Sequence, residues 1–201
     1  MDMHLEARIE PHWARIPDLP SSRVSGRTHG VAWLPGEGLV VFAQAAPAVH
    51  FFDARGQWQR AWGERFCGAH GLTLVEEGGK SALWLTDQYS CEVGCYDLSG
   101  RLMRSLERPE HPLYTEGAYV PTWVAVHEKR HGGDGAVWVA DGYGSSLVHQ
   151  FDADGRARRT LTGEEGAGRF QCPHALAIDL RGPEPELLIA DRGNHRVQVY
   201  G

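Results

Sequence analysis

The sequence lacks any apolar run that approaches the length of a membrane-spanning helix, and it lacks a strong excess of either charge. Its 201 residues carry a formal net charge of −6, and the Lys and Arg residues are scattered rather than clustered. Scattered basic residues do not form the positive patch that nucleic acids bind, so we expect neither a nucleic acid partner nor a membrane span. Residues 1–10 carry acids and His where a signal peptide needs basic and then apolar residues, so none is predicted.

Cysteine is also scarce, with four residues in the chain. Cys67 and Cys172 stand at similar places before a His, and Cys91 and Cys95 form a C-x-x-x-C pattern. An even number permits disulfides in a secreted protein, but no signal peptide fixes the compartment. We interpret the four mainly as small buried residues, and keep disulfides, or zinc binding by Cys91 and Cys95, as alternatives.

Glycine and proline are abundant, and a motif order repeats along the chain. An Asp-x-x-Gly turn signal occurs at 53–56, 97–100 and 152–155, each time after a short run that ends in an aromatic residue. Apolar runs closed by aspartate occur at 83–87, 137–141 and 188–191, and Gln44 is taken as the corresponding residue of the first repeat. Further apolar runs start the repeats at 30–33, 71–74, 123–126 and 175–178. The β-branched and aromatic content predicts strands, four in a complete repeat.

Four short antiparallel strands that recur every roughly 40 to 55 residues are typical of the blades of a β-propeller. A β-sandwich is the alternative, but it gives no reason for one motif order to recur. We predict an all-β chain with an N-terminal segment over 1–23 and a propeller over 24–201. The predicted blades span about 24–63, 66–107, 118–162 and 168–201, the last of them incomplete. The segment before His29 could lend a strand, from Met3–Ile9 or Arg15–Leu19.

The first strand of every propeller blade lines a central channel, so equivalent residues of different blades converge there. The residues just before these strands are His29, His70, Thr122 and His174. Three imidazoles around one axis are what a three-His zinc site with an open position requires. The alternative for each His is an ordinary hydrogen-bonding role at a strand start. We expect the imidazoles of His70 and His174 at one end of the channel, with His29 nearby.

The last repeat points to a known module. Residues 168–179 and 189–200 resemble the NHL repeat closely, and Asn194-His195 supplies the N-H pair of that name. The resemblance covers nearly the whole chain from about residue 24. NHL repeats occur in many unrelated proteins, so they imply the fold rather than the chemistry. We expect His195 to be a turn residue.

A narrower resemblance follows the order of the segments 69–73, 121–126, 139–143, 172–176 and 190–192. This order is similar to that of peptidyl-α-hydroxyglycine α-amidating lyase (peptidylamidoglycolate lyase). That family is a six-bladed NHL-type propeller enzyme that cleaves a peptidyl-α-hydroxyglycine into the peptide amide and glyoxylate, with zinc held by three His. The resemblance implies part of a six-bladed ring, a peptide substrate ending in α-hydroxyglycine, and a secretory or extracellular location.

The same resemblance implies roles for four residues. His70 and His174 match zinc ligands, Tyr143 matches the catalytic tyrosine, and Arg192 matches an active-site arginine. Zinc would lower the pKa of the substrate hydroxyl, and Tyr143 would assist proton transfer. Arg192 would hold the substrate carboxylate with its planar fork of donors. The alternatives are that Tyr143 packs at the channel rim and that Arg192 pairs with a neighbouring aspartate, Asp191 or Asp141.

The sequence departs from the family at several of its positions. It holds no counterpart of the family's third zinc His, which lies in a Pro-His-Asp context, so His29 is the candidate third ligand. Gln44 stands where the family has a second active-site arginine, and an amide does not neutralise a carboxylate. Val120 and Gly144 stand where the family has two cysteines, which is consistent with one lost disulfide.

The family also holds a central calcium, bound partly by backbone carbonyls of inner strands. Val31 and Leu72 match two of these positions, so calcium is carried as a second candidate cofactor. We therefore predict a zinc-dependent lyase-like propeller. The main alternative is a non-catalytic NHL propeller that binds a peptide or protein partner. A lactonase-like hydrolase would need acidic calcium ligands along the channel, where this sequence has His.

Overall fold

The computed structural model of the chain describes residues 10–23 and 28–201. These residues form four antiparallel sheets, and a short helix, α1 (Pro20–Arg23), precedes them. Blade 1 consists of β1 (Thr28–Leu34), β2 (Gly38–Ala43), β3 (Val49–Phe52) and β4 (Trp58–Trp62). Blade 2 consists of β5 (Ala69–Glu77), β6 (Lys80–Asp87), β7 (Glu92–Asp97) and β8 (Leu102–Leu106). Blade 3 consists of β9 (Trp123–Val126), β10 (Val137–Asp141), β11 (Leu147–Phe151) and β12 (Ala157–Leu161). Blade 4 consists of β13 (Pro173–Asp179), β14 (Glu186–Asp191) and β15 (Arg196–Tyr200).

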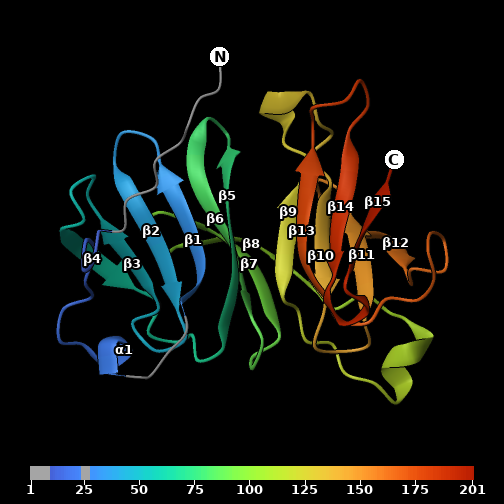
Figure 1. Cartoon of the computed structure of the whole chain (residues 1–201), viewed down its shortest axis with the longest axis horizontal. Coiled ribbons are helices and arrows are strands. Elements are labelled where there is room, and N and C mark those ends of the chain that lie inside the picture. The colour runs from blue at the N-terminus through green and yellow to red at the C-terminus, as the bar shows by residue number, and fades with distance from the viewer. Residues whose placement is uncertain (1–9, 24–27) are drawn as a thin grey trace.

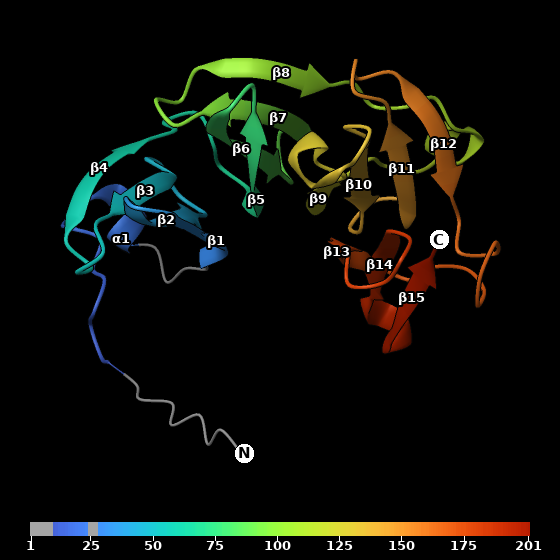
Figure 2. The same ribbon diagram turned by 90° about the horizontal axis from the view of Figure 1, so that it is seen from above.

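The blades stand side by side in chain order around a common centre (Figures 1 and 2). In each sheet the strands pair with their sequence neighbours, so the first strand lies innermost and the last lies outermost. Three short 3-10 helices interrupt the connections: η1 (Pro112–Thr115), η2 (Lys129–His131) and η3 (Arg192–Asn194). The predicted all-β propeller of four NHL-type blades is confirmed. Each sheet lies within the range expected for its blade, and blade 4 has three strands in the described residues.

The N-terminal segment differs from the expectation. Residues 15–19 form no strand, and the structure describes only α1 as a regular element between residues 10 and 23. The other proposed strand donor, Met3–Ile9, lies outside the described residues. The prediction that the N-terminal segment could lend a strand is therefore wrong for Arg15–Leu19.

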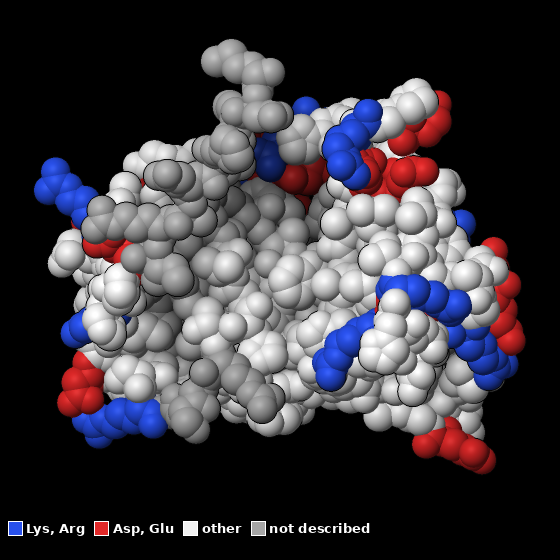
Figure 3. All heavy atoms as spheres, in the orientation of Figure 1, with Lys and Arg blue, Asp and Glu red and all other residues white. Residues whose placement is uncertain are grey.

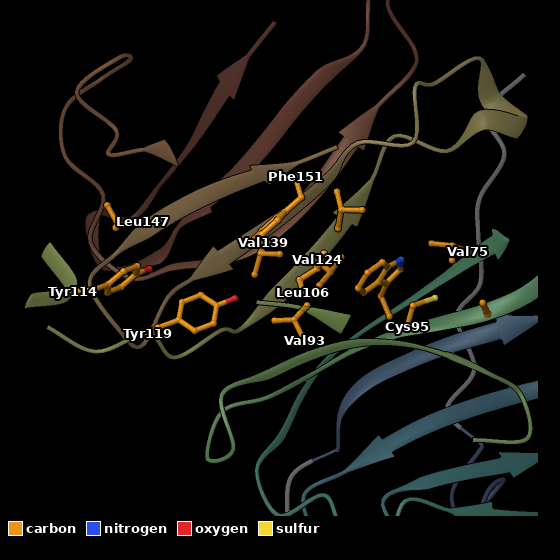
Figure 4. Close-up of a cluster of buried hydrophobic side chains, with 13 residues drawn as sticks. Val75, Val93, Cys95, Leu106, Tyr114, Tyr119, Val124, Val139, Leu147 and Phe151 are labelled. Atoms are coloured by element: carbon orange, nitrogen blue, oxygen red, sulfur yellow. The ribbon is translucent and has the colours of Figure 1, made fainter. Parts of the chain in front are cut away.

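The hydrophobic core lies between the blades rather than inside one of them. Blades 2 and 3 pack through a cluster in which Trp84, Val93, Val139 and Phe151 are almost fully buried, and Figure 4 shows part of it. Similar clusters join blades 1 and 2 and blades 3 and 4. All five residues of β10 are buried, because a central strand between two neighbouring blades is covered on both faces.

A buried aspartate closes the second strand of blades 2, 3 and 4. These residues are Asp87, Asp141 and Asp191, all 0% exposed. Their carboxylates accept hydrogen bonds from backbone N–H groups of Cys67 and Gly68, of Val120, and of Gln171, respectively. Each donor lies one to three residues before the first residue of the inner strand of its blade. The aspartates therefore fasten the segments that lead into the inner strands.

Blade 1 is built differently at this point. The strand register pairs Ala43 with Thr28, as it pairs Asp87 with Ala69 and Asp191 with Pro173. Ala43, not Gln44, is thus the counterpart of the buried aspartates, which corrects the sequence-based alignment of the first repeat. Gln44 is instead the counterpart of the residue after the aspartate, which in blade 4 is Arg192.

The four blades form an arc that is open between blade 1 and blade 4 (Figure 2). The blade faces at the two sides of the opening expose apolar side chains: Val31 (60%), Trp33 (51%), Val197 (61%) and Val199 (52%). On the face seen in Figure 3, acidic and basic side chains form small dispersed groups around broad uncharged areas. Within the described residues, no helix is long and apolar enough to cross a membrane.

Candidate functional site

Three imidazoles meet where the inner strands begin. The ring centroid of His70 lies 4.5 Å from that of His29 and 4.8 Å from that of His174. These residues come from blades 2, 1 and 4, and Thr122 of blade 3 lies against His70. The structure therefore brings together side chains as far apart in the sequence as His29 and His174 at one end of the arc, as expected from their equivalent places in the repeat.

His70 is held in one orientation. Its side chain is 1% exposed, and its Nδ1 lies 2.8 Å from the carbonyl oxygen of Thr122. Because a carbonyl only accepts, Nδ1 carries the proton and Nε2 keeps its lone pair in the neutral ring. Burial lowers the pKa of His70 to about 4, and the neighbouring imidazoles and the guanidinium of Arg192 act in the same direction. His70 is thus a neutral imidazole whose Nε2 lone pair faces the hydroxyl of Tyr143.

The hydroxyl of Tyr143 joins the other groups. It lies 2.9 Å from Nε2 of His174 and 3.3 Å from Nε2 of His70, and Arg192 donates to it from Nη1 at 3.2 Å. Tyr143 follows the end of β10 by two residues and is 40% exposed. A hydroxyl with two imidazoles and one guanidinium around it can accept and pass on a proton. Tyr143 therefore contacts the cluster directly and is more than a packing residue at the rim.

Arg192 is directed to the site rather than to an aspartate. Asp191 forms its ion pair with Arg196, whose Nε lies 2.7 Å from Oδ2. No ion pair between Arg192 and Asp191 or Asp141 occurs in the part of the chain that the structure describes. The pairing alternative raised from the sequence is wrong. The Arg192 side chain reaches Tyr143 instead and remains exposed, with further N–H donors on its guanidinium.

The glycine after His70 lets the inner strands approach one another. A Cβ at Gly71 would lie 2.5 Å from the Thr122 carbonyl oxygen and 3.0 Å from Oγ1 of Thr86. The close approach is what brings the Thr122 carbonyl within reach of His70. A larger residue at 71 would therefore push the third blade away from the site.

The donor set has the chemistry that zinc prefers, with neutral imidazoles whose Nε2 atoms converge. Burial also lowers the pKa of His174, which keeps that ring neutral as well. Among the described residues, however, no group of three or more His, Cys, Asp or Glu side chains is arranged to hold a metal. His70 and His174 fit as two ligands, and their zinc role, like that of His29, stays a prediction.

The calcium prediction also stays untested. Leu72 is buried and Val31 is 60% exposed. The two strands that carry these residues lie close together, since a Cβ at Gly30 would be 2.3 Å from Cβ of Leu72. The predicted carbonyl positions are therefore on adjacent inner strands.

The cysteines differ in part from their interpretation as small buried residues. Cys67, Cys91, Cys95 and Cys172 are all free thiols. Cys95 is buried and packs in the core between blades 2 and 3, but Cys67 is exposed. The disulfide alternative is wrong for these four residues.

Two groups of important residues were missed by the sequence analysis. The aspartates at the ends of β6, β10 and β14 served only as markers of the repeat, although their recurrence before a turn was a usable signal. Tyr114, which donates to Asp141, and His149, which contacts the Tyr114 hydroxyl, gave no signal, because Tyr114 lies in the connection between two blades.

Comparison with known proteins finds relatives of this chain. No protein-family model matches the chain. It is 26% identical over 210 residues to human NHL repeat-containing protein 3, which covers 96% of this chain and 56% of that protein. It is 32% identical over 138 residues to a probable peptidyl-α-hydroxyglycine α-amidating lyase of Caenorhabditis elegans, covering 65% of this chain and 36% of that protein. It is 34% identical over 142 residues to rat peptidylglycine α-amidating monooxygenase, covering 65% of this chain and 13% of that protein.

Solved structures agree on the fold. Virginiamycin B lyase from Staphylococcus aureus superimposes with a TM-score of 0.61 at 17% identity, over 93% of this chain and 58% of that one. The chain spans about half the length of the NHL repeat-containing relatives that it matches. The chain is a β-propeller that is similar at modest identity to NHL repeat-containing proteins and to peptidyl-α-hydroxyglycine α-amidating lyases.

Proposed function

We propose that this propeller carries a zinc-dependent lyase site that cleaves a peptidyl-α-hydroxyglycine into a peptide amide and glyoxylate. The observation that supports it best is the position of the Tyr143 hydroxyl, within 3.3 Å of His70, His174 and Arg192. These are the four residues that the resemblance to the lyase selects, and they come from three different blades. An arrangement with two neutral imidazoles, a phenol and a guanidinium suits a proton transfer beside a bound carboxylate.

The reaction needs a base for one proton and a donor for another. The hydroxyl proton of the substrate leaves, the C–N bond breaks as the C=O bond of glyoxylate forms, and the amide nitrogen gains a proton. When bound, zinc supplies a Lewis acid that favours loss of the hydroxyl proton, and His70 and His174 would hold it. Tyr143 lies where it can take that proton and return one to the departing nitrogen, so the proton count balances.

Arg192 orients the substrate in this proposal. Its guanidinium is exposed, permanently charged and next to Tyr143, so a carboxylate bound to its other N–H groups would lie beside the phenol. The resulting placement selects substrates with a terminal carboxylate one carbon away from the reacting hydroxyl. The proposed substrate class, a peptide that ends in α-hydroxyglycine, has this spacing.

The test measures zinc and glyoxylate in the same preparations. We expect the zinc-supplied chain to release glyoxylate, and His70→Ala or His174→Ala to lose both the metal and the activity. Tyr143→Phe should retain zinc but react roughly 100-fold more slowly, the lower end of what a general acid–base residue contributes. His195→Ala, at an exposed turn between β14 and β15, is the matched control and should behave as the parent protein. Full activity in His174→Ala would exclude the site.

A non-catalytic propeller that binds a peptide or protein is the second candidate. It is favoured by the alignment to an NHL repeat-containing protein over 96% of the chain and by Gln44 at the place of the second arginine. Metal content separates the two functions, because only the lyase requires stoichiometric zinc. A chain that binds peptides but holds no zinc and releases no glyoxylate would support this second function.

A further inference from the structure

We propose that Tyr114, Asp141 and His149 form a buried clamp that positions Tyr143, and that this clamp sets the rate of the lyase reaction proposed above, on which the inference rests. None of the three touches the candidate ligands His70 and His174. They are positioning residues, which act through the turn that carries Tyr143.

Asp141 holds both sides of that turn. Its Oδ1 accepts from the backbone N–H of Val120 at 2.6 Å, and its Oδ2 accepts from that of Ser145 at 2.8 Å. Tyr143 itself donates its backbone N–H to the carbonyl of Val120 at 3.3 Å. One buried carboxylate thus ties the segment before β9 to the residues that follow Tyr143. A shift of Asp141 would move the phenol relative to the imidazoles.

The carboxylate is in turn fixed by Tyr114 and His149. The Tyr114 hydroxyl donates to Oδ2 of Asp141 at 2.9 Å and lies 2.6 Å from Nε2 of His149. Because the only hydroxyl proton goes to the carboxylate, Nε2 of His149 carries a proton and donates. Nδ1 then accepts from Oγ1 of Thr160 at 2.9 Å. Burial lowers the pKa of His149 to about 4, so the ring is neutral and every group in the chain of bonds is satisfied.

The other two buried aspartates are stabilised in different ways. Asp191 has an ion pair with Arg196, and Asp87 accepts from four backbone N–H groups. Among the described residues no Lys or Arg pairs with Asp141, and burial raises its pKa to about 6. In blade 3 the neutral phenol of Tyr114 donates to the carboxylate at the place where blade 4 uses the guanidinium of Arg196. Among the described residues Tyr114 is the only side chain that donates to Asp141, whereas Asp191 accepts from the side chains of Asn194, Arg196 and Gln198.

The turn also has no room for a side chain at position 144. A Cβ at Gly144 would lie 2.1 Å from Oδ1 of Asp141 and 2.3 Å from the carbonyl oxygen of Ala118. Gly144 and Val120 are the positions where the lyase resemblance leads one to expect cysteines. In this chain the carboxylate occupies the space beside Gly144, so the polar clamp does the holding there.

Tyr114→Phe tests the clamp, because it removes one hydroxyl and keeps the ring. Tyr119→Phe is the matched control: Tyr119 is 5% exposed, its ring centroid lies 5.8 Å from that of Tyr114, and its hydroxyl has no hydrogen-bond partner within the described residues. The readouts are kcat, KM, zinc content, and hydrogen exchange of the amides of residues 143–145. We expect Tyr114→Phe to lower kcat about tenfold, corresponding to about 1.4 kcal/mol, with KM and zinc unchanged and faster exchange at Ser145. Tyr119→Phe should change none of these.

A milder variant covers the case in which Tyr114→Phe does not fold. Thr160→Val removes only the outermost hydrogen bond and should change kcat and exchange in the same direction, about threefold. Unchanged kcat together with unchanged exchange in whichever variant folds overturns the clamp. If the parent chain releases no glyoxylate, the proposed function fails, but faster exchange at Ser145 in Tyr114→Phe still supports the clamp.

Discussion

At the scale of single residues, the environment decides what each histidine can do. His70 and His149 are both buried, and burial lowers the pKa of each to about 4. Their partners differ: Nε2 of His70 faces the partly exposed hydroxyl of Tyr143, while both ring nitrogens of His149 are hydrogen-bonded to the buried side chains of Tyr114 and Thr160. One histidine is therefore available for a ligand and the other serves the structure. The sequence alone does not separate them, because tautomer and burial arise from the tertiary contacts.

Gln44 gives a prediction at the same scale. The register makes it the blade 1 counterpart of Arg192, next to the start of β1, the strand that carries His29. Gln44→Arg would add a second guanidinium near the substrate carboxylate, and a charge-assisted hydrogen bond of about 1.5 kcal/mol corresponds to a roughly tenfold lower KM. Steady-state kinetics of glyoxylate release check the change in KM.

One further substitution helps to interpret that result. Gln44→Lys adds the charge without the fork and should lower KM less than Gln44→Arg does. An increase in KM in Gln44→Arg would contradict the assignment of this position to carboxylate binding.

At the scale of the element, buried aspartates at the ends of the second strands hold the loops of blades 2, 3 and 4 in place. Asp87 accepts from Cys67 and Gly68 on one oxygen and from Tyr89 and Ser90 on the other. These bonds connect the end of β6 with the segment that leads to His70. The Asp87 side chain thus joins the end of β6 to the start of β5, the strand that carries His70.

Asp87→Asn should destabilise the chain strongly. Its NH₂ group would face two N–H donors that are at least partly buried, and leaving two such donors without an acceptor costs about 2 kcal/mol. Urea unfolding followed by circular dichroism measures the loss. Asp154→Asn, at a side chain that is 70% exposed, is the control and should change stability by less than about 0.5 kcal/mol. A loss below about 1 kcal/mol in Asp87→Asn would contradict this role.

The strands and blades could be predicted because each is encoded locally. Runs such as 137–141 carry β-branched and aromatic residues between turn signals, and their recurrence along the chain predicts the propeller. The convergence of His29, His70 and His174 followed from the repeat as well. The clamp could not be predicted, since Tyr114 approaches Asp141 from an irregular connection without periodicity. The correct counterpart of the aspartates in blade 1 needed the strand register, which shows Ala43 there.

At the scale of the whole molecule, the arc leaves two blade faces without a neighbour (Figure 2). Elsewhere in the chain such faces pack against the next blade and are buried. The exposed residues on the open faces, Trp33 on β1 and Val199 on β15 among them, are the kind of surface that associates. The open outer edge of a sheet adds to this tendency.

We expect the 201-residue chain to associate in a concentration-dependent way. Trp33→Glu with Val199→Glu should reduce the association, because each charge makes burial of the face costly. Leu102→Glu with Met103→Glu is the control. These two residues are exposed to a similar extent, 46% each, but lie on β8, away from the opening. Sedimentation velocity over a range of concentrations measures the effect. A parent chain that stays monomeric at high concentration would contradict the expectation.

Because imidazoles from blades 1, 2 and 4 meet at the site, the distances between them depend on how strongly the arc of blades is curved. Because each ring is fixed to its own blade, a small rotation of one blade against the next changes the separation of the rings at the centre. Conversely, any group that binds His70 and His174 together sets the angle across three blades at once. The affinity of His70 and His174 for a shared ligand and the bend of the arc then both depend on the angles between the blades. A change in the packing between blades therefore alters both.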